Sequence, residues 1–192
     1  MNFQISNLLK NPLKKKSHLA VDIGTASIKM VELDVGKGKL FLKNYAILTT
    51  SGHLERLNDA IQTSSLKIID KETASLLRLV LRQMKTKATL AVASLPAFSI
   101  FSALIDLPIM SPAEVSKTMQ YQARSFIPLP LTEVTIDWLP ISQFEDKQGV
   151  KKQRLFLTAV PNEQIKRYQN IFRLAGLNLQ RLRWKPCLWR GS

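Results

Sequence analysis

The sequence has few of the residues that build covalent and metal frameworks. Its 192 residues include one cysteine, Cys187, and two histidines, His18 and His53. A single cysteine excludes an intramolecular disulfide framework and is typical of a reducing compartment. Two histidines and one cysteine are too few for the usual zinc site with nitrogen and sulfur ligands. We expect no catalytic arrangement that depends on histidine or cysteine.

Acidic residues are also scarce, since 14 Asp and Glu stand against 28 Lys and Arg, giving a net charge of +14. Such an excess indicates nucleic-acid binding when it gathers on one surface. Here residues 1–20 hold four basic and no acidic residues, and 181–192 hold the same numbers. More than half of the excess therefore lies on two short ends, and we expect no nucleic-acid partner.

Long apolar runs are absent as well. The longest uncharged stretch, 88–105, contains Pro96 and four Ser or Thr residues, so it predicts two strands rather than a membrane helix. No long apolar region follows the basic run 14–16, which excludes a signal peptide of the usual kind. We expect a soluble, cytoplasmic chain whose residues 1–17 form a basic flexible leader.

Hydrophobic patterns divide the remaining chain into two kinds of segment. Strands are expected at 19–23, 28–33 and 40–48, a helix over 70–84 capped by Asp70, and a strand over 89–95. From 97 to 176 the order is strand, helix, strand, strand, helix, which is an α+β pattern. The first of these helices begins with a capping box of Ser111 and Glu114. Its expected inner face consists of Val115, Met119, Ala123, Phe126 and Ile127.

The segment with chemical meaning is Asp-Ile-Gly-Thr-Ala-Ser-Ile-Lys at 22–29. A glycine and small hydroxyl residues after a buried strand let several N–H groups face an anion, which predicts a phosphate-binding hairpin. Lys29 would supply a point charge, and Asp22 would hold a hydrated Mg²⁺. A plain hairpin with a glycine turn fits these residues equally well. It is not a P-loop, because the Gly-Lys-Ser/Thr ending and the following helix are missing.

Several segments together resemble one family. Residues 21–33, Val-Asp-Ile-Gly-Thr-Ala-Ser-Ile-Lys-Met-Val-Glu-Leu, resemble the first phosphate loop of the actin-like ATPases, and the Val-Glu-Leu ending is most similar to the type IV pilus assembly PilM family. Residues 122–138, Gln-Ala-Arg-Ser-Phe-Ile-Pro-Leu-Pro-Leu-Thr-Glu-Val-Thr-Ile-Asp-Trp, are similar to a second segment of that family. The resemblance covers roughly residues 17–180.

The resemblance implies an α/β fold. An actin-like (ribonuclease H-like) subdomain is expected over 18–95, a small inserted α+β subdomain of the FtsA/PilM kind over 96–176, and a return segment over 177–192. Full-length members continue into a second lobe, which we expect to be missing here. The first-lobe phosphate residues of the family correspond to Asp22, Gly24, Thr25, Ser27 and Lys29, with ATP and Mg²⁺ as ligands of the full-length form. Half of a nucleotide clamp predicts weak ATP binding and no hydrolysis by this chain.

The same resemblance implies a scaffold rather than an enzyme. Members of the family dock the N-terminal tail of an inner-membrane PilN-like protein and link it to the pilus motor ATPase. We expect such a peptide in a groove between the actin-like and inserted parts, with indirect membrane association at the inner face of the cytoplasmic membrane. Three alternatives stay open: a fragment of an actin-fold ATP-dependent kinase, a cell-division FtsA-like protein, and a basic nucleic-acid-binding domain.

The last segment departs from the family pattern. From residue 181 the sequence reads Arg-Leu-Arg-Trp-Lys-Pro-Cys-Leu-Trp-Arg-Gly-Ser, whereas a strand returning to an actin-like core should be apolar. Codons read in a shifted frame are compatible with a more apolar, Glu-containing segment of the family kind. We therefore expect a frameshift near 180–183, a fold that ends near Gln180 without a returning strand, and an exposed apolar surface.

Overall fold

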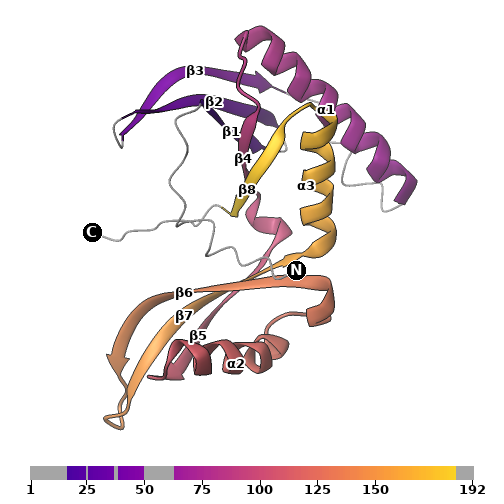
Figure 1. Ribbon diagram of the computed structural model, residues 1–192. Helices are drawn as coiled ribbons and strands as arrows, with labels where there is room; N and C mark the ends of the chain where they lie inside the picture. The colour runs from indigo at the N-terminus through magenta and orange to yellow at the C-terminus, as the bar shows by residue number, and fades with distance from the viewer. Residues whose placement is uncertain (1–16, 25, 37–38, 50–62, 185–192) are drawn as a thin grey trace. The chain divides into compact units, whose positions relative to one another are not determined.

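The computed structural model describes residues 17–24, 26–36, 39–49 and 63–184. They divide into two compact units (Figure 1). The five-stranded unit comprises the described residues of 17–96 and 165–184, and the three-stranded unit comprises 97–164. One unit is therefore assembled from two separate segments of the chain, and the other is continuous.

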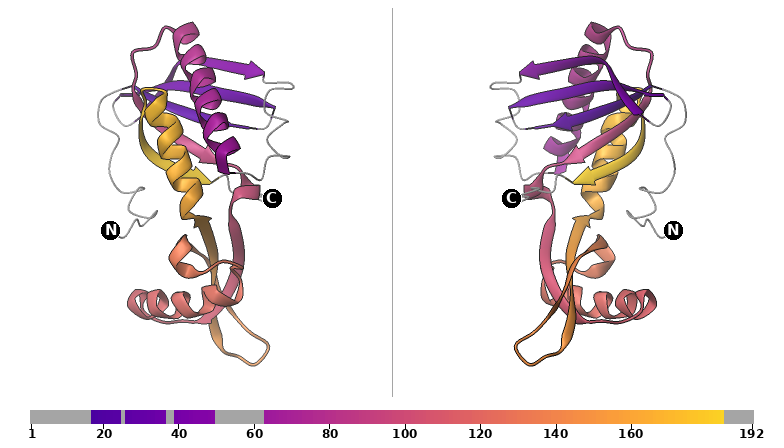
Figure 2. Two further views of the ribbon diagram at one scale, coloured as in Figure 1. Left: turned by 90° about the vertical axis from the view of Figure 1, so that its right-hand side faces the viewer. Right: turned by 90° about the vertical axis from the view of Figure 1, so that its left-hand side faces the viewer.

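The five-stranded unit is built on a mixed sheet with strand order β3-β2-β1-β4-β8. The pairs β1–β2 and β2–β3 are antiparallel, whereas β1–β4 and β4–β8 are parallel. Both helices lie on the same side of the sheet (Figure 2). The elements are β1 (His18–Ile23), β2 (Ser27–Gly36), β3 (Lys39–Thr49), α1 (Thr63–Met84), β4 (Leu90–Leu95), α3 (Asn162–Leu174) and β8 (Asn178–Trp184).

Alternation along the strands places the core of this unit under the two helices. Leu19 and Val21 of β1 are buried while Ala20, the residue that separates them, is exposed. Leu77 of α1 and Phe172 of α3 are fully buried as well, and burying each such side chain stabilises the fold by about 1.5–3 kcal/mol. The opposite face of the sheet carries no helix among the described residues, and we call it the open face.

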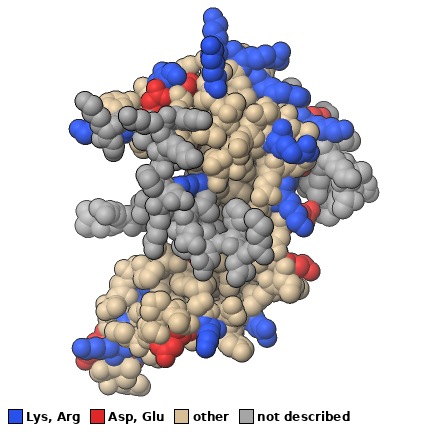
Figure 3. Space-filling view, in the orientation of Figure 1, with Lys and Arg blue, Asp and Glu red and all other residues tan. Residues whose placement is uncertain are grey.

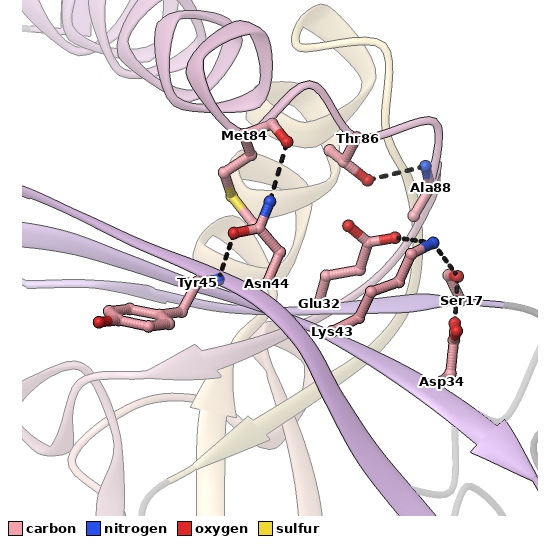
Figure 4. Close-up of polar contacts among 9 residues, drawn as sticks. All are labelled: Ser17, Glu32, Asp34, Lys43, Asn44, Tyr45, Met84, Thr86 and Ala88. Carbon is pink, nitrogen blue, oxygen red and sulfur yellow. Dashed lines mark hydrogen bonds and ion pairs between the residues drawn. The ribbon is translucent and has the colours of Figure 1, made fainter.

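A buried polar group lies on the helix side of the same sheet. Glu32 is 2% exposed, and the Lys43 ammonium lies 3.0 Å from its carboxylate. Lys43 also donates to the hydroxyl of Ser17, which donates in turn to Asp34 (Figure 4). The Asn44 side chain donates to the carbonyl of Met84 at 2.9 Å and ties β3 to the end of α1 (Figure 4). The ion pair with Lys43 offsets the free-energy cost of burying the Glu32 carboxylate.

The helix expected over 70–84 begins seven residues earlier, at Thr63. Asp70 is therefore inside the helix, and its expected capping role is wrong. Its carboxylate is largely buried and accepts from the guanidinium of Arg167 on α3 at 2.7 Å. Asp is a good cap by local preference, but a partner 97 positions away in the sequence uses this carboxylate instead.

The expectation that the fold ends near Gln180 without a returning strand is also wrong. β8 continues to Trp184 and pairs in parallel with β4 as far as Leu95. Among the described strands it lies at the edge of the sheet and pairs with β4 alone, so it needs apolar residues mainly toward the helices. Leu179 and Leu182 pair with the buried Ala91 and Ala93, and basic residues alternate with them. The rest of the tail, 185–192, lies outside the described residues.

The three-stranded unit is an antiparallel sheet, β5-β7-β6, with α2 packed against it. Leu155 and Leu157 of β7 and Met119 of α2 are at most 1% exposed and form the centre of its core. The strand–helix–strand–strand order matches the sequence pattern. The elements are β5 (Phe101–Pro108), α2 (Pro112–Gln122), β6 (Val134–Glu145) and β7 (Lys151–Pro161), with short 3-10 turns at Ala97–Ser99, Ala123–Ser125 and Leu131–Glu133.

The capping box of α2 is confirmed. The Ser111 hydroxyl accepts from the backbone N–H of Glu114, and the Glu114 carboxylate accepts from the backbone N–H of Ser111 at 2.8 Å. The expected inner face is confirmed except for Phe126, which is 47% exposed. A 3-10 turn follows α2 at Ala123–Ser125, and its three residues per turn shift the phase of the helix. Phe126 therefore points outward while Ile127 stays buried.

The boundary between the units differs from the one expected at 176. The division falls at Gln164, inside α3, so that most of this helix belongs to the five-stranded unit. Tyr168 and Phe172 of α3 stack on each other within that unit. At the start of the helix, the Asn162 side chain bonds to Thr135 and Thr132 of the three-stranded unit.

Candidate functional site

The candidate site is the turn that joins β1 to β2 at one end of the five-stranded sheet. Asp22 pairs with Lys29 and Ile23 with Ile28, so only four residues lie outside the ladder. The backbone N–H of Gly24 donates to the carbonyl of Ser27 at 2.9 Å and closes the turn. A Cβ atom at position 24 would lie 3.1 Å from that carbonyl oxygen, which explains why a glycine stands here.

Asp22 is held by a residue from another strand. The hydroxyl of Ser94, on β4, donates to the Asp22 carboxylate at 2.6 Å. The two residues are direct partners in the parallel β1–β4 ladder, so the bond follows from the register. Ser94 was not among the expected site residues. The signal for it was a polar residue in an otherwise apolar strand, Leu90–Leu95.

The other expected residues lie as follows. Ser27 is half-buried at the start of β2, and Lys29 is exposed on the same strand. Lys29 and Asp22 are direct cross-strand partners and therefore share a face of the sheet. Thr25 lies outside the described residues. The structure thus brings together Asp22, Lys29 and Ser94, with Gly24 and Ser27 forming the turn beside them.

The expected role of the backbone N–H groups in the turn needs correction at Gly24. Backbone N–H groups of the turn were expected to face an anion, but the N–H of Gly24 is used by the carbonyl of Ser27. Because one N–H serves one good acceptor, this group stabilises the turn instead of binding a ligand. The side chains of Lys29 and Ser27 and the remaining N–H groups are what the turn can offer to a phosphate.

These residues fit ATP with Mg²⁺ only in part. Within the described ranges, no group of three or more His, Cys, Asp and Glu side chains could hold a metal ion. Asp22, already bonded to Ser94, could therefore hold Mg²⁺ only through water and with oxygen ligands from a phosphate. Lys29 fits a phosphate as a point charge.

The Asp22 carboxylate also influences the pKa of Tyr168 on α3. Burial raises the pKa of the Tyr168 hydroxyl to about 12, Arg167 lowers it, and the Asp22 carboxylate raises it further. Tyr168 is 7% exposed, so the phenol stays neutral at physiological pH. Tyr168 contributes to the core beside α3 and not to the chemistry of the turn.

A shallow depression lies at the other end of the same sheet. Its lining includes Thr89 just before β4, Gln169 and Arg173 on one face of α3, and Asn178 at the start of β8. Since β1 and β4 are parallel, this end is opposite the turn at Gly24. Asp22, Gly24, Ser27 and Lys29, the expected phosphate residues that the structure describes, do not line the depression.

His18 is buried in the sheet, and His53 lies outside the described residues. Among the helices that the structure describes, none is long and apolar enough to cross a membrane.

Comparisons with known proteins place this fold. The profile of the family described as type IV pilus assembly protein PilM matches residues 20–182. The structure is similar to a chain of the PilM-PilN type IV pilus biogenesis complex, with a TM-score of 0.70 and 22% identity over 90% of this chain. The alignment covers 48% of that chain, so this chain spans about half its length. No curated protein sequence matches.

A second solved structure is more distant. It is the cytoplasmic domain of EpsL, an inner membrane component of the type II secretion system of Vibrio cholerae, with a TM-score of 0.51, 10% identity, and coverage of 88% of this chain and 57% of that one. These likenesses confirm the expected α/β fold with an actin-like subdomain and an inserted α+β subdomain. The profile match extends over most of the chain, and the chain therefore belongs to the family of the type IV pilus assembly protein PilM.

Proposed function

We propose that the chain is a scaffold of type IV pilus assembly that docks the N-terminal tail of a PilN-like inner-membrane protein. The observations that carry this proposal are the PilM family match over residues 20–182 and the similarity of 90% of the chain to a chain of a PilM-PilN complex. Docking would hold the protein at the inner face of the cytoplasmic membrane, and a pilus motor ATPase is the further partner. We assign the chain no catalytic role.

Both units offer exposed apolar surface, which supports a protein-binding role. On the three-stranded unit, Leu104 and Leu139 are more than half exposed, and both pair with Phe156 on the central strand. They form an apolar row across the sheet face away from α2. On the five-stranded unit, Tyr45 and Ile47 of the edge strand β3 are 66% and 63% exposed. Exposed apolar residues that gather in rows favour interaction sites.

The docking proposal is tested by fluorescence anisotropy with a labelled peptide of the PilN tail encoded in the same genome. We expect a micromolar Kd, which is about 8 kcal/mol of binding free energy. A peptide of the same composition in scrambled order is the control. Saturable binding of both peptides, or of neither, by folded protein would contradict the proposal.

Two surface variants then locate the peptide. Replacing Leu104 and Leu139 by Ser tests the apolar row of the three-stranded unit, and replacing Tyr45 and Ile47 by Ser tests β3. A large loss of affinity in one variant alone identifies the surface that receives the peptide. We expect the PilN-like tail to carry an Asn-Leu-Leu-type core, which Asn-Leu-Leu at 7–9 of this chain resembles. Deletion of residues 1–12, which lie outside the described residues, tests whether this segment competes with the peptide. Tighter binding after the deletion is the expected result.

The second part of the proposal is a weak nucleotide-phosphate site at the β1–β2 turn. Asp22 and Lys29 are neighbours in the ladder, and Ser94 orients the Asp22 carboxylate. Asp22 would face the Mg²⁺ ion of a bound Mg²⁺-phosphate, and Lys29 would face the phosphate. We expect millimolar binding of ATP with Mg²⁺ and therefore little change in melting temperature. A large Mg²⁺-dependent rise that Asp22→Ala abolishes would show that the site is strong and contradict this part.

A further inference from the structure

Four polar residues lie in a single row across the open face of the five-stranded sheet. Asp22 on β1 pairs with Lys29 on β2 and with Ser94 on β4, and Ser94 pairs with Arg183 on β8. Directly paired residues point to the same face of a sheet. The row therefore runs in the order Lys29, Asp22, Ser94, Arg183.

Burial shows that this row is on the open face. Val21 and Ala93, which precede Asp22 and Ser94, are at most 3% exposed and face the helices. Successive side chains of a strand point to opposite faces, so Asp22 and Ser94 face away from α1 and α3. Arg183 follows Leu182, the partner of Ala93, and faces the same way.

The row also lies at the end of the sheet where α/β proteins bind ligands. Asp22, Ser94 and Arg183 are each the next-to-last residue of β1, β4 and β8, and these three strands are parallel. Open α/β sheets bind ligands outside the carboxyl ends of their parallel strands. The turn at Gly24 borders the same end.

The two cationic ends of the row suit an elongated anion that carries Mg²⁺, because the Asp22 carboxylate between them would repel a bare phosphate. Lys29 and Arg183 are both exposed, and among the described residues no acidic side chain forms an ion pair with either. They stand three strands apart, so their backbones are about 14 Å apart, and both side chains are long enough to lean inward above Asp22 and Ser94. That spacing fits a linear oligophosphate better than a single phosphate.

We propose that Arg183 is a second cationic contact of the phosphate site, opposite Lys29, and that the site takes a linear oligophosphate of the kind a nucleoside triphosphate carries. The inference rests on the proposed phosphate-binding role of the turn and adds a residue to it. Arg183 lies just beyond the family match, which ends at residue 182. A guanidinium can bind two phosphate oxygens at once, whereas Lys29 supplies a point charge.

The test is an amide NMR titration of the whole ¹⁵N-labelled chain with ATP and Mg²⁺ and, separately, with inorganic tripolyphosphate and Mg²⁺. We expect shifts at the amides of Ser27 and Ser94 in both titrations. Arg183→Ala should raise the apparent Kd about fivefold, as removal of one exposed ion pair does, and Lys29→Ala should do the same. Arg183→Lys should have a smaller effect because it keeps the charge but loses the planar fork.

The matched control is Arg173→Ala. Arg173 is an exposed arginine of the same unit that lines the depression at the opposite end of the sheet, so its loss changes the net charge equally. We expect its Kd to stay within about twofold of the unaltered chain, because exposed charges further apart than a Debye length are largely screened. Arg183→Gln replaces Arg183→Ala if the alanine variant does not fold.

Three results would overturn the inference, and they are distinguishable. If Lys29→Ala weakens binding but Arg183→Ala behaves like Arg173→Ala, the phosphate site stands and Arg183 is not part of it. If Arg183→Ala weakens binding of ATP but not of tripolyphosphate, Arg183 contacts the nucleoside instead of the phosphates. If neither ligand shifts any amide of the turn, the proposed phosphate site fails together with the inference.

Discussion

The two units of this chain differ in how they are assembled and in the charge they carry. The three-stranded unit is one continuous segment, 97–164, with six basic and seven acidic residues. The five-stranded unit joins two segments, and its described residues include 14 basic and five acidic ones. Figure 3 shows basic side chains gathered over the unit that contains α1, and side chains of both signs on the unit that contains α2.

This difference shows that the excess of basic residues behind the net charge of +14 is not spread evenly over the chain. A nearly neutral unit with exposed apolar rows suits a protein partner, whereas a basic unit whose sheet ends in Lys29 and Arg183 suits an anion. The proposed phosphate site therefore lies on the basic unit, whereas candidate apolar surfaces for the peptide occur on both units. Four predictions follow from the contrast, each placed on one unit with a counterpart on the other.

The largest expected effect comes from emptying each core in turn. Phe172→Ala in the five-stranded unit should cost about 3–5 kcal/mol, and Leu157→Ala in the three-stranded unit about 2–5 kcal/mol, since both side chains are at most 1% exposed. Hydrogen exchange followed by mass spectrometry should show faster exchange within the altered unit only. Equal acceleration in both units by either variant would show that they unfold as one.

The second prediction compares a buried ion pair with an exposed one. Arg167→Ala leaves the largely buried carboxylate of Asp70 without its partner, and we expect a loss of about 1–3 kcal/mol in urea unfolding. Its counterpart is Arg154, which pairs with Asp106 on the three-stranded unit with both side chains more than a third exposed. Arg154→Ala should have a clearly smaller effect, because water screens the pair. The comparison fails if the two losses are equal.

The third prediction concerns the helix that begins with a capping box. Ser111→Ala removes the acceptor for the Glu114 N–H, and we expect a loss of about 1 kcal/mol confined to the three-stranded unit. Ser111→Asp should restore most of it, because an aspartate caps equally well. Exchange rates in α1, which belongs to the other unit, serve as the internal control.

The smallest effects on stability are expected from pH. The three-stranded unit should lose stability in acid, and the five-stranded unit should lose it in alkali. The Lys152 ammonium, 2.7 Å away, and the backbone N–H groups of Val150 and Gln148 lower the pKa of Asp146 to about 2. Its stabilising contribution is therefore complete above pH 3.8, its ordinary value, and is lost as the pH falls through about 2. NMR titration of the carboxyl carbon should give that value, and Lys152→Ala should move it upward.

Tyr168 gives the alkaline counterpart in the five-stranded unit. Burial raises the pKa of its hydroxyl to about 12 from an ordinary 10.0. Because the raised pKa means that the folded state prefers the neutral phenol, the contribution is complete below pH 10.0 and is lost as the pH rises through about 12. Ultraviolet titration, with Tyr168→Phe as the control, should show one late-ionising tyrosine. Ionisation near pH 10 would contradict its burial.

Comparison of the expected with the observed elements shows which features depend only on residues close together in the sequence. The Ser111–Glu114 box, the β1–β2 hairpin and the order of elements from 97 to 161 all depend on residues near one another in sequence, and they could be predicted. Phe126 could not, because a single 3-10 turn changes the direction of its side chain. Asp70 could not, because its partner Arg167 comes from a distant helix.

The candidate site divides in the same way. The sequence alone indicated Asp22, Gly24, Ser27 and Lys29, because a tight turn after a buried strand brings them together by local geometry. Ser94 and Arg183 reach the same row only through parallel pairing of β1, β4 and β8.

Local patterns of glycine, caps and apolar periodicity therefore determined the elements and the turn of this protein. Parallel strands need long connections, so no short-range signal sets their register. The tertiary structure alone decided that the basic segment after Gln180 is an edge strand and that its Arg183 stands in line with the turn.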